Sequence, residues 1–252
     1  MKKRRWFSLF LSFALLLPLF SLTSADAYED FTLDAKAGLL IEADTGEILY
    51  EKNAHQENYP ASLTKVMVAL LVFEAIDEGK IALTDSVTAT ESAFEGLSSD
   101  GSTANIVPGE TMTVEQLLNC MLIVSANEAC NILGETLYGS VDAFVARMNE
   151  RAAELGCEHT HFANATGLHN SQHYTTAWDL YLITREALKH DKFMEICNSK
   201  SYTVPATNMT DKPRELHSTN FLISNWRARG YVYRDAQGIK TGSTPEAGYC
   251  LI

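Results

Sequence analysis

The stretch SLTKVMVALLVFEAIDE, residues 62–78, is apolar on nearly every side of a helix and is followed by Gly79. Glycine readily adopts the left-handed conformation that ends a helix. A surface helix would carry one polar face, and this run carries none along most of its length. We therefore expect it to form a helix that is buried on all sides at the centre of the fold.

Sequence runs typical of β-strands stand on both sides of this helix. Residues 37–51 read as two short strands around a glycine-containing turn, and residues 238–252 read as two more. The chain between them is mostly helical, with a loop-rich stretch at 198–235. N-cap patterns begin helical runs at Thr113, Ser140 and Thr176. We expect an α/β (α+β) fold in which the N- and C-terminal strands form one antiparallel sheet and the helices are inserted between them.

The first 27 residues have the order of a secretory signal peptide. Basic residues at positions 2–5 precede an apolar run from Trp6 to Phe20, and Ala-Asp-Ala follows at 25–27. The run is shorter than the roughly 20 residues that a membrane-spanning helix needs, and Pro18 interrupts it. We expect cleavage after Ala27 and export by the general secretory or the twin-arginine route. The mature domain, residues 28–252, would then act outside the cytoplasm.

The charge balance argues against nucleic acid as a partner. The chain has 20 Lys and Arg against 32 Asp and Glu; removing residues 1–27 takes away four basic residues and one acidic residue, which leaves a formal charge of −15. Such a surface repels a phosphate backbone.

Neither the cysteines nor the histidines predict a cofactor. The five cysteines lack the paired short spacings of a disulfide framework, and Cys120 and Cys130 read as buried thiols. His169 and His173 are four residues apart, but Asn170 stands where the H-E-x-x-H zinc motif has its glutamate. We expect no metal and no cofactor.

A serine and a lysine stand three residues apart where the apolar helix begins. Ser62 and Lys65 would lie one turn apart on the same face, so that the amine approaches the hydroxyl. Burial loosens the hold of an amine on its proton, and a neutral lysine can act as the base for a serine nucleophile. The alternative is that Ser62 only caps the helix and Lys65 extends to solvent.

Two later triplets extend this pair to a three-part pattern. SAN at 125–127 falls between helical runs, and KTG at 240–242 falls on a late strand. S-x-x-K, S-x-N and K-T-G in this order are the signature of penicillin-binding proteins and serine β-lactamases. STN at 218–220 also fits S-x-N, but the apolar run before Ser125 is better suited to hold a polar turn rigidly.

Longer stretches around the triplets resemble the low-molecular-mass D-alanyl-D-alanine carboxypeptidases, which trim peptidoglycan stem peptides. The stretches are YPASLTKVM, SANEACNIL, FANATGLHNSQHYTTAWDL, STNFL and GIKTGSTPEAGYCL. The resemblance implies a β-lactamase/transpeptidase-like fold with the site in a cleft between an α/β lobe and a helical lobe. Because the chain stops within an apolar strand-like run, we expect a catalytic domain that is incomplete at its C-terminus. Any membrane association would then depend on the missing C-terminal segment.

The resemblance implies three catalytic residues. Ser62 is the expected nucleophile, which becomes acylated, and Lys65 is its base. Ser125 is expected to relay a proton toward the leaving D-alanine.

The same resemblance implies the substrate contacts. Asn127 is expected to bind the substrate amide and to hold Lys65. Lys240 and Thr241 are expected to meet the terminal carboxylate, for which a cation and a hydroxyl are a suitable receptor. Gly242 would let substrate approach the strand closely. The backbone N–H groups of Ser62 and Ser243 would form the oxyanion hole.

The sequence thus predicts a serine D-Ala-D-Ala carboxypeptidase that acts on stem pentapeptides and binds β-lactams covalently. A class A β-lactamase is the nearest alternative, but residues 163–176, where that enzyme has its deacylating glutamate, contain no Asp or Glu. The sequence alone leaves two more functions open. One is that of a protein that binds without turnover, and the second is that of an endopeptidase or transpeptidase that uses the same acyl-enzyme.

Overall fold

The computed structural model of the protein describes residues 32–252, so the predicted signal peptide lies outside the described residues. The elements below belong to one unit, Lys36–Ile252. The helices are α2 (Lys65–Asp77), α3 (Val114–Ile123), α4 (Asn127–Tyr138), α5 (Val141–Glu154), α6 (Ala177–Ala187) and α7 (Asp191–Cys197), with 3₁₀ turns η2 (Ala61–Thr64) and η3 (Ser92–Phe94). The strands are β1 (Gly38–Ile41), β2 (Ile48–Lys52), β3 (Ser86–Thr88), β4 (Thr111–Thr113), β5 (Ser201–Val204), β6 (Arg214–His217), β7 (Thr241–Thr244) and β8 (Gly248–Leu251).

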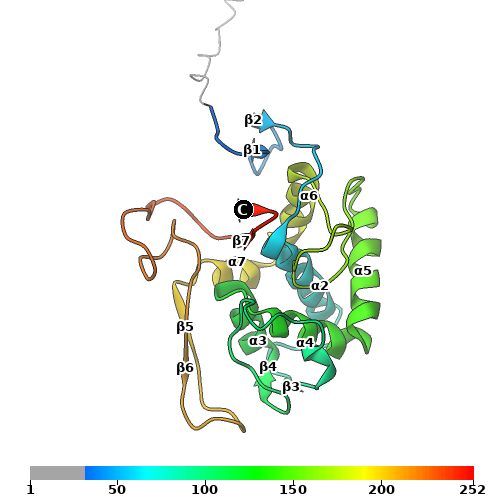
Figure 1. Cartoon of the computed structure of the whole chain (residues 1–252), viewed down its shortest axis with the longest axis vertical. Helices are drawn as coiled ribbons and strands as arrows, with labels where there is room; N and C mark the ends of the chain where they lie inside the picture. The colour runs from blue at the N-terminus through cyan, green and yellow to red at the C-terminus, as the bar shows by residue number, and fades with distance from the viewer. Residues whose placement is uncertain (1–31) are drawn as a thin grey trace, which may run out of the picture. The chain divides into compact units, whose positions relative to one another are not determined.

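Helix α2 lies at the centre of the helices, as its apolar sequence predicts (Figure 1). It contacts α3, α4, α5 and α6, and its side chains are buried from Lys65 through Phe73. Each fully buried aliphatic or aromatic side chain of this kind contributes about 1.5–3 kcal/mol. Only its start departs from the prediction: residues 61–64 form the 3₁₀ turn η2, and Ala61, its first residue, has a left-handed φ of 48°. This turn carries Ser62.

The predicted N-caps of three helices are present. Thr113 and Gln116 form a reciprocal capping box at the start of α3. The hydroxyls of Ser140 and Thr176 each accept a backbone N–H in the first turn of α5 and α6. These side chains satisfy donors that the first turn of a helix leaves free, and they mark where the three helices begin.

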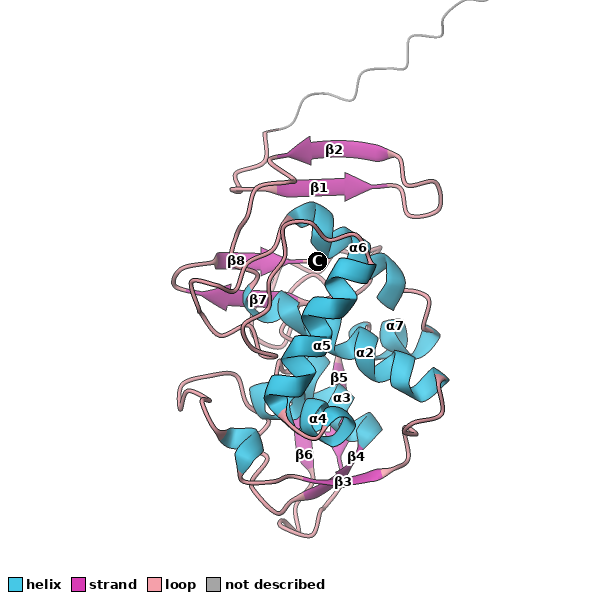
Figure 2. Cartoon of the chain, turned by 90° about the vertical axis from the view of Figure 1, so that its right-hand side faces the viewer, coloured by secondary structure: helices cyan, strands magenta, loops and turns pink. Residues whose placement is uncertain are grey.

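The predicted mixed fold with antiparallel strands is confirmed, but the single sheet is not formed among residues 32–252. β1 pairs with β2, and β7 pairs with β8, each as a separate antiparallel hairpin (Figure 2). No ladder joins the two hairpins within the described chain, and Tyr249 on β8 is fully exposed. Within each hairpin, a strand pairs along only one of its two edges.

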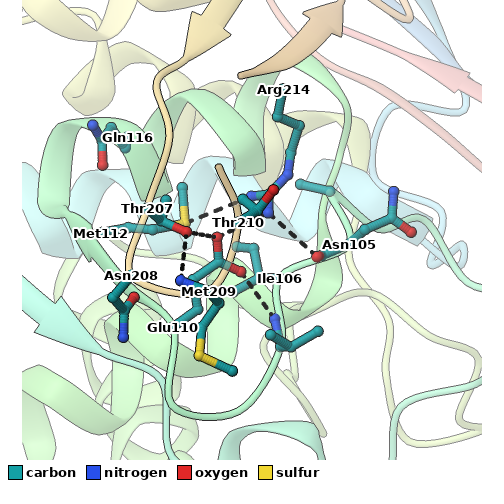
Figure 3. Close-up of polar contacts among 12 residues, drawn as sticks. Asn105, Ile106, Glu110, Met112, Gln116, Thr207, Asn208, Met209, Thr210 and Arg214 are labelled. Carbon is teal, nitrogen blue, oxygen red and sulfur yellow. Dashed lines mark hydrogen bonds and ion pairs between the residues drawn. The ribbon is translucent and has the colours of Figure 1, made fainter. Parts of the chain in front are cut away.

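The stretch 198–235, predicted as loop-rich, contains a hairpin formed by β5 and β6. The strands are short and the tip between them is polar, so the sequence resembles a loop. Buried contacts of Glu110 hold the hairpin in place (Figure 3). The carboxylate of Glu110, which is 1% exposed, accepts Arg214 Nη2 at 2.8 Å and Thr207 Oγ1 at 2.9 Å through one oxygen. Its other oxygen accepts Val107 N–H at 3.1 Å. This ion pair fastens the hairpin to the segment before β4 and so places the chain that follows β6.

The part of the chain that the structure describes contains no helix long and apolar enough to cross a membrane.

We expect Gly134→Ala to destabilise the helical lobe, although alanine is the better helix former. A Cβ at position 134 would lie 2.3 Å from Cδ1 of Phe144, a fully buried side chain of α5. Overpacking of this kind costs about 1–3 kcal/mol, or about 2–4 °C in Tm for each kcal/mol in a chain of this size. Thermal denaturation measures the loss, and adding Phe144→Leu should restore part of it. A Tm at or above that of the unmodified protein would contradict the prediction.

Candidate active site

The turn η2 and the start of α2 bring Ser62 and Lys65 together. The 3₁₀ turn exposes part of Ser62, whereas Lys65, the first residue of α2, is fully buried. Lys65 Nζ lies 2.9 Å from Ser62 Oγ. The predicted approach of amine to hydroxyl is therefore present, and Lys65 does not extend to solvent.

Two further contacts orient the Lys65 amine. Its Nζ donates to Asn127 Oδ1 at 2.9 Å and to the backbone carbonyl of Thr166 at 2.6 Å. Both oxygens can only accept, so each takes one N–H of the amine. When Lys65 is neutral, its two N–H bonds are occupied in this way and its lone pair points at Ser62 Oγ. A neutral amine held in this way can accept a proton from a neighbouring hydroxyl.

Burial favours the neutral form of Lys65. Desolvation is the main cause that lowers the pKa of this lysine below its usual value. Glu128, at the start of α4, acts in the opposite direction through its charge. Its carboxylate accepts Thr103 Oγ1 and Ala104 N–H, which ties it to the neighbouring loop. The amine therefore becomes a base at a lower pH than an exposed lysine does.

Ser125 and Lys240 form the second polar contact of the site. Ser125 lies in the turn between α3 and α4 with a left-handed φ of 65°, an uncommon conformation for a serine. Lys240 Nζ donates to Ser125 Oγ at 3.1 Å and to the Thr241 carbonyl at 2.7 Å. Burial, and secondly the charge of Lys65, lowers the pKa of Lys240 to about 7. Two lysines thus share one desolvated site.

Strand β7 lies directly beside the turn that carries Ser62. A Cβ at Gly242 would be 2.9 Å from the backbone N of Ser62 and 3.2 Å from that of Leu63. Thr241 precedes this contact and Ser243 follows it on the same strand. Only glycine lets the strand come this close to η2. The predicted K-T-G residues therefore lie against the S-x-x-K turn.

The competing STN triplet has a different environment. Asn220 is buried, and its Nδ2 donates to the Gly238 carbonyl, while its backbone N–H donates to Ser218 Oγ. Ser125 and Asn127, in contrast, contact the two buried lysines. Among the S-x-N candidates, the geometry places only the 125–127 triplet at the lysines.

Comparison with known proteins identifies the family of the chain. Residues 23–252 match the family Peptidase S11, described as D-alanyl-D-alanine carboxypeptidase. The chain belongs to this family.

Similar proteins match most of the length of this chain. D-alanyl-D-alanine carboxypeptidase DacF of Bacillus subtilis is 40% identical over 218 residues, which is 86% of this chain and 53% of DacF. The crystal structure of the Streptomyces K15 DD-transpeptidase has a TM-score of 0.78 at 31% identity and covers 89% of this chain and 86% of its own. DacD from Francisella tularensis gives the same TM-score at 26% identity, over 93% of this chain and 67% of its own. The chain spans about half the length of curated relatives such as DacF and DacC of Escherichia coli.

The S11 site contains contacts that the sequence did not predict. The carbonyl of Thr166 holds Lys65, and the hydroxyl of Thr219 lies 2.6 Å from that of Thr241. A third is His173, whose Nε2 lies 2.8 Å from Thr64 Oγ1. Thr64 stands within the S-x-x-K motif, so this histidine reaches the motif from a distant part of the chain.

The four histidines between residues 159 and 173 have separate partners. His159 pairs with Glu57, His161 bonds the Gln172 carbonyl, and the ring of His169 packs edge-on against Tyr59. His173 contacts Thr64. Within residues 32–252, no group of three His, Cys, Asp or Glu side chains gathers as a metal site.

Proposed function

We propose that residues 28–252 form the catalytic domain of a serine D-alanyl-D-alanine carboxypeptidase. It would remove the terminal D-alanine from peptidoglycan stem pentapeptides and would bind β-lactams covalently. The observation that carries the proposal is the Lys65 amine, which two carbonyl oxygens aim at Ser62 Oγ. Membership of Peptidase S11 supports the substrate class. Peptidoglycan lies outside the cytoplasm, which agrees with the signal peptide predicted at residues 1–27.

Acylation begins with proton transfer from Ser62 to Lys65. As the proton leaves, Ser62 Oγ attacks the carbonyl carbon of the penultimate D-alanine. The oxyanion that forms is stabilised by the backbone N–H groups of Ser62 and Ser243, at the contact between η2 and β7. The tetrahedral intermediate then expels the amine of the terminal D-alanine, which takes up a proton relayed through Ser125. Water later attacks the ester on Ser62 and releases the shortened peptide.

The remaining predicted residues bind the substrate in this proposal. Lys240 supplies a buried cation and Thr241 a hydroxyl for the terminal carboxylate. Asn127 bonds the substrate amide with its free N–H while its oxygen keeps Lys65 in place. Gly242 leaves room for the peptide beside Ser62. No metal or other cofactor takes part in any step.

Slow loss of a penicillin adduct distinguishes this proposal from a β-lactamase. Residues 163–176 supply a carbonyl to Lys65 but carry no carboxylate that could activate water. The nearby buried Asp179 accepts hydrogen bonds from His159 N–H at 2.9 Å and from Thr160 Oγ1 at 2.7 Å, both through Oδ2, which tie its side chain to the segment at residues 159–160. Penicillin should therefore acylate Ser62 and stay bound.

Intact mass over time tests the proposal. The purified protein is incubated with a reporter penicillin, and D-alanine release from a D-Ala-D-Ala peptide is followed in parallel, with Ser62→Ala as the control. We expect a long-lived adduct on Ser62 together with D-alanine release, and neither for the control. Rapid adduct loss with drug hydrolysis would indicate a β-lactamase instead. No adduct would refute a catalytic serine.

Transpeptidation is a second candidate, since the similar Streptomyces K15 structure is that of a DD-transpeptidase. The two reactions share the acyl-enzyme and differ in the acceptor, which is water in one and an amine in the other. Adding an acceptor amine to the D-alanine release assay separates them, because a transpeptidase yields the amide-linked product by mass.

A further inference from the structure

We infer that His173 is a positioning residue for the nucleophile Ser62, acting through Thr64 and Ala61. The inference rests on the proposed function, because it concerns how Ser62 is held for acylation. His173 is 2% exposed and belongs to the loop that begins at Ala163. Its ring lies where this loop meets the turn η2. Its two ring nitrogens bond to opposite sides of this boundary.

These hydrogen bonds form a series from Ala163 through His173 and Thr64 to Ala61, and the donor and acceptor in each bond follow from the chemistry of the groups. The backbone N–H of Ala163 lies 3.1 Å from His173 Nδ1 and can only donate, so Nδ1 is an acceptor. In the neutral ring the proton is then on Nε2, which donates to Thr64 Oγ1 at 2.8 Å. Thr64 uses its own proton toward the Ala61 carbonyl at 2.8 Å, because a carbonyl oxygen cannot donate.

The series of hydrogen bonds ends at Ala61, the strained residue next to the nucleophile. Ala61 has a φ of 48°, a left-handed conformation that is strained for a non-glycine residue. Its carbonyl also lies against Gly167, where a Cβ would come within 1.9 Å of the oxygen. The peptide between Ala61 and Ser62 is therefore held from both sides. Such strain persists only where surrounding contacts determine the conformation.

The loop that begins at Ala163 thus contacts both the Lys65 amine and the turn that carries Ser62. The carbonyl of Thr166 orients the Lys65 amine, and His173 holds the turn from which Ser62 projects. Burial, followed by the charges of His161, Lys65 and His169, lowers the pKa of His173 to about 4. The ring therefore stays neutral near pH 7 and keeps the tautomer that the chain requires.

A matched pair of variants separates the two nitrogens of the ring. In His173→Asn the amide oxygen replaces Nδ1 and still accepts Ala163 N–H, but the donor to Thr64 is lost. In His173→Gln the amide nitrogen reaches the place of Nε2 and keeps that donor. Misplacement of reacting groups can lower a rate by about 10²-fold. We expect the maximal acylation rate to fall by about 10–100-fold in the Asn variant and by only a few-fold in the Gln variant, with little change in KM for a D-Ala-D-Ala peptide.

Thr64 supplies an independent second arm. Thr64→Val should reproduce the loss seen in His173→Asn, whereas Thr64→Ser should keep the rate. The double variant His173→Asn/Thr64→Val should acylate no more slowly than the slower of its two single variants. Tm is measured for every variant, and only rates of folded proteins are compared. Equal rates for the Asn and Gln variants, or additive losses in the double variant, would overturn the inference. If the unmodified protein itself formed no penicillin adduct, it is the proposed function that would fail.

Discussion

We expect Lys65→Met to lower the rate of Ser62 acylation by about 10²–10⁴-fold, the usual contribution of a general base. Methionine fills similar volume in the fully buried site, but its thioether sulfur is not basic enough to take the serine proton. Asn127 Oδ1 and the Thr166 carbonyl also lose their donor, so the variant removes the whole orienting network. Stopped-flow acylation by a reporter penicillin measures the loss.

The pH dependence of the same rate identifies Lys65 as the titrating group. Because burial lowers its pKa, the neutral base appears at a lower pH than in an exposed lysine, and the acylation rate rises with pH as the proton leaves. Measurements well below pH 7, where Lys240 keeps most of its proton, should separate this rise from the titration of Lys240. The rise should vanish in Lys65→Met. Lys189→Met, which alters an exposed lysine paired with Glu186, should leave both rate and profile unchanged. An unaffected rate in Lys65→Met would exclude a role as base.

Gly242→Ala should lower acylation by about 10²–10³-fold, the usual cost of losing one oxyanion-hole donor. The new methyl group would lie 2.9 Å from the Ser62 nitrogen, and its neighbours there, two backbone nitrogens and Ala61 Cβ, cannot rotate away. Either β7 or η2 must move, and the two N–H groups then no longer converge on one oxygen. The effect should fall on the rate of acylation more than on thermal stability.

The same assay gives the control for this substitution. Tyr249→Ser alters the partner strand β8 at a fully exposed position, so it tests whether any change to the hairpin slows the reaction. We expect this variant to acylate normally. A Gly242→Ala protein that acylated at the normal rate would show that β7 does not shape the oxyanion hole.

The central helix and the motif contacts were predictable because their signals are local. An unbroken apolar run identifies α2, and residue types that rarely occur together identify Ser62, Lys65 and the later triplets. The family resemblance was confirmed by the match to Peptidase S11 over residues 23–252. The assigned roles of these residues stay predictions, although the geometry brings Lys65, Ser125, Asn127 and Lys240 to one place.

Other features depend on contacts that no local pattern encodes. The carbonyl of Thr166 is a backbone atom, which every residue has, and its bond to Lys65 spans 101 residues. His173 resembles the neighbouring loop histidines in sequence, and only its contact with Thr64, 109 residues away, sets it apart. The hairpin of β5 and β6 has four-residue strands around a polar tip, too short a pattern to stand out from loop. The predicted single sheet required pairing between distant strands, which strand propensity alone cannot specify.

The buried Lys240 makes ligand binding a proton-linked event. With a pKa of about 7, this lysine is protonated in only about half of the empty molecules at neutral pH. A carboxylate that arrives beside it favours the charged form, so the site takes up part of a proton from solvent as it binds the anion. Well below pH 7 that proton is already present, and affinity for an anionic ligand should be nearly constant. Above pH 7 each molecule must first recruit the proton, so affinity should decline as the medium becomes more alkaline.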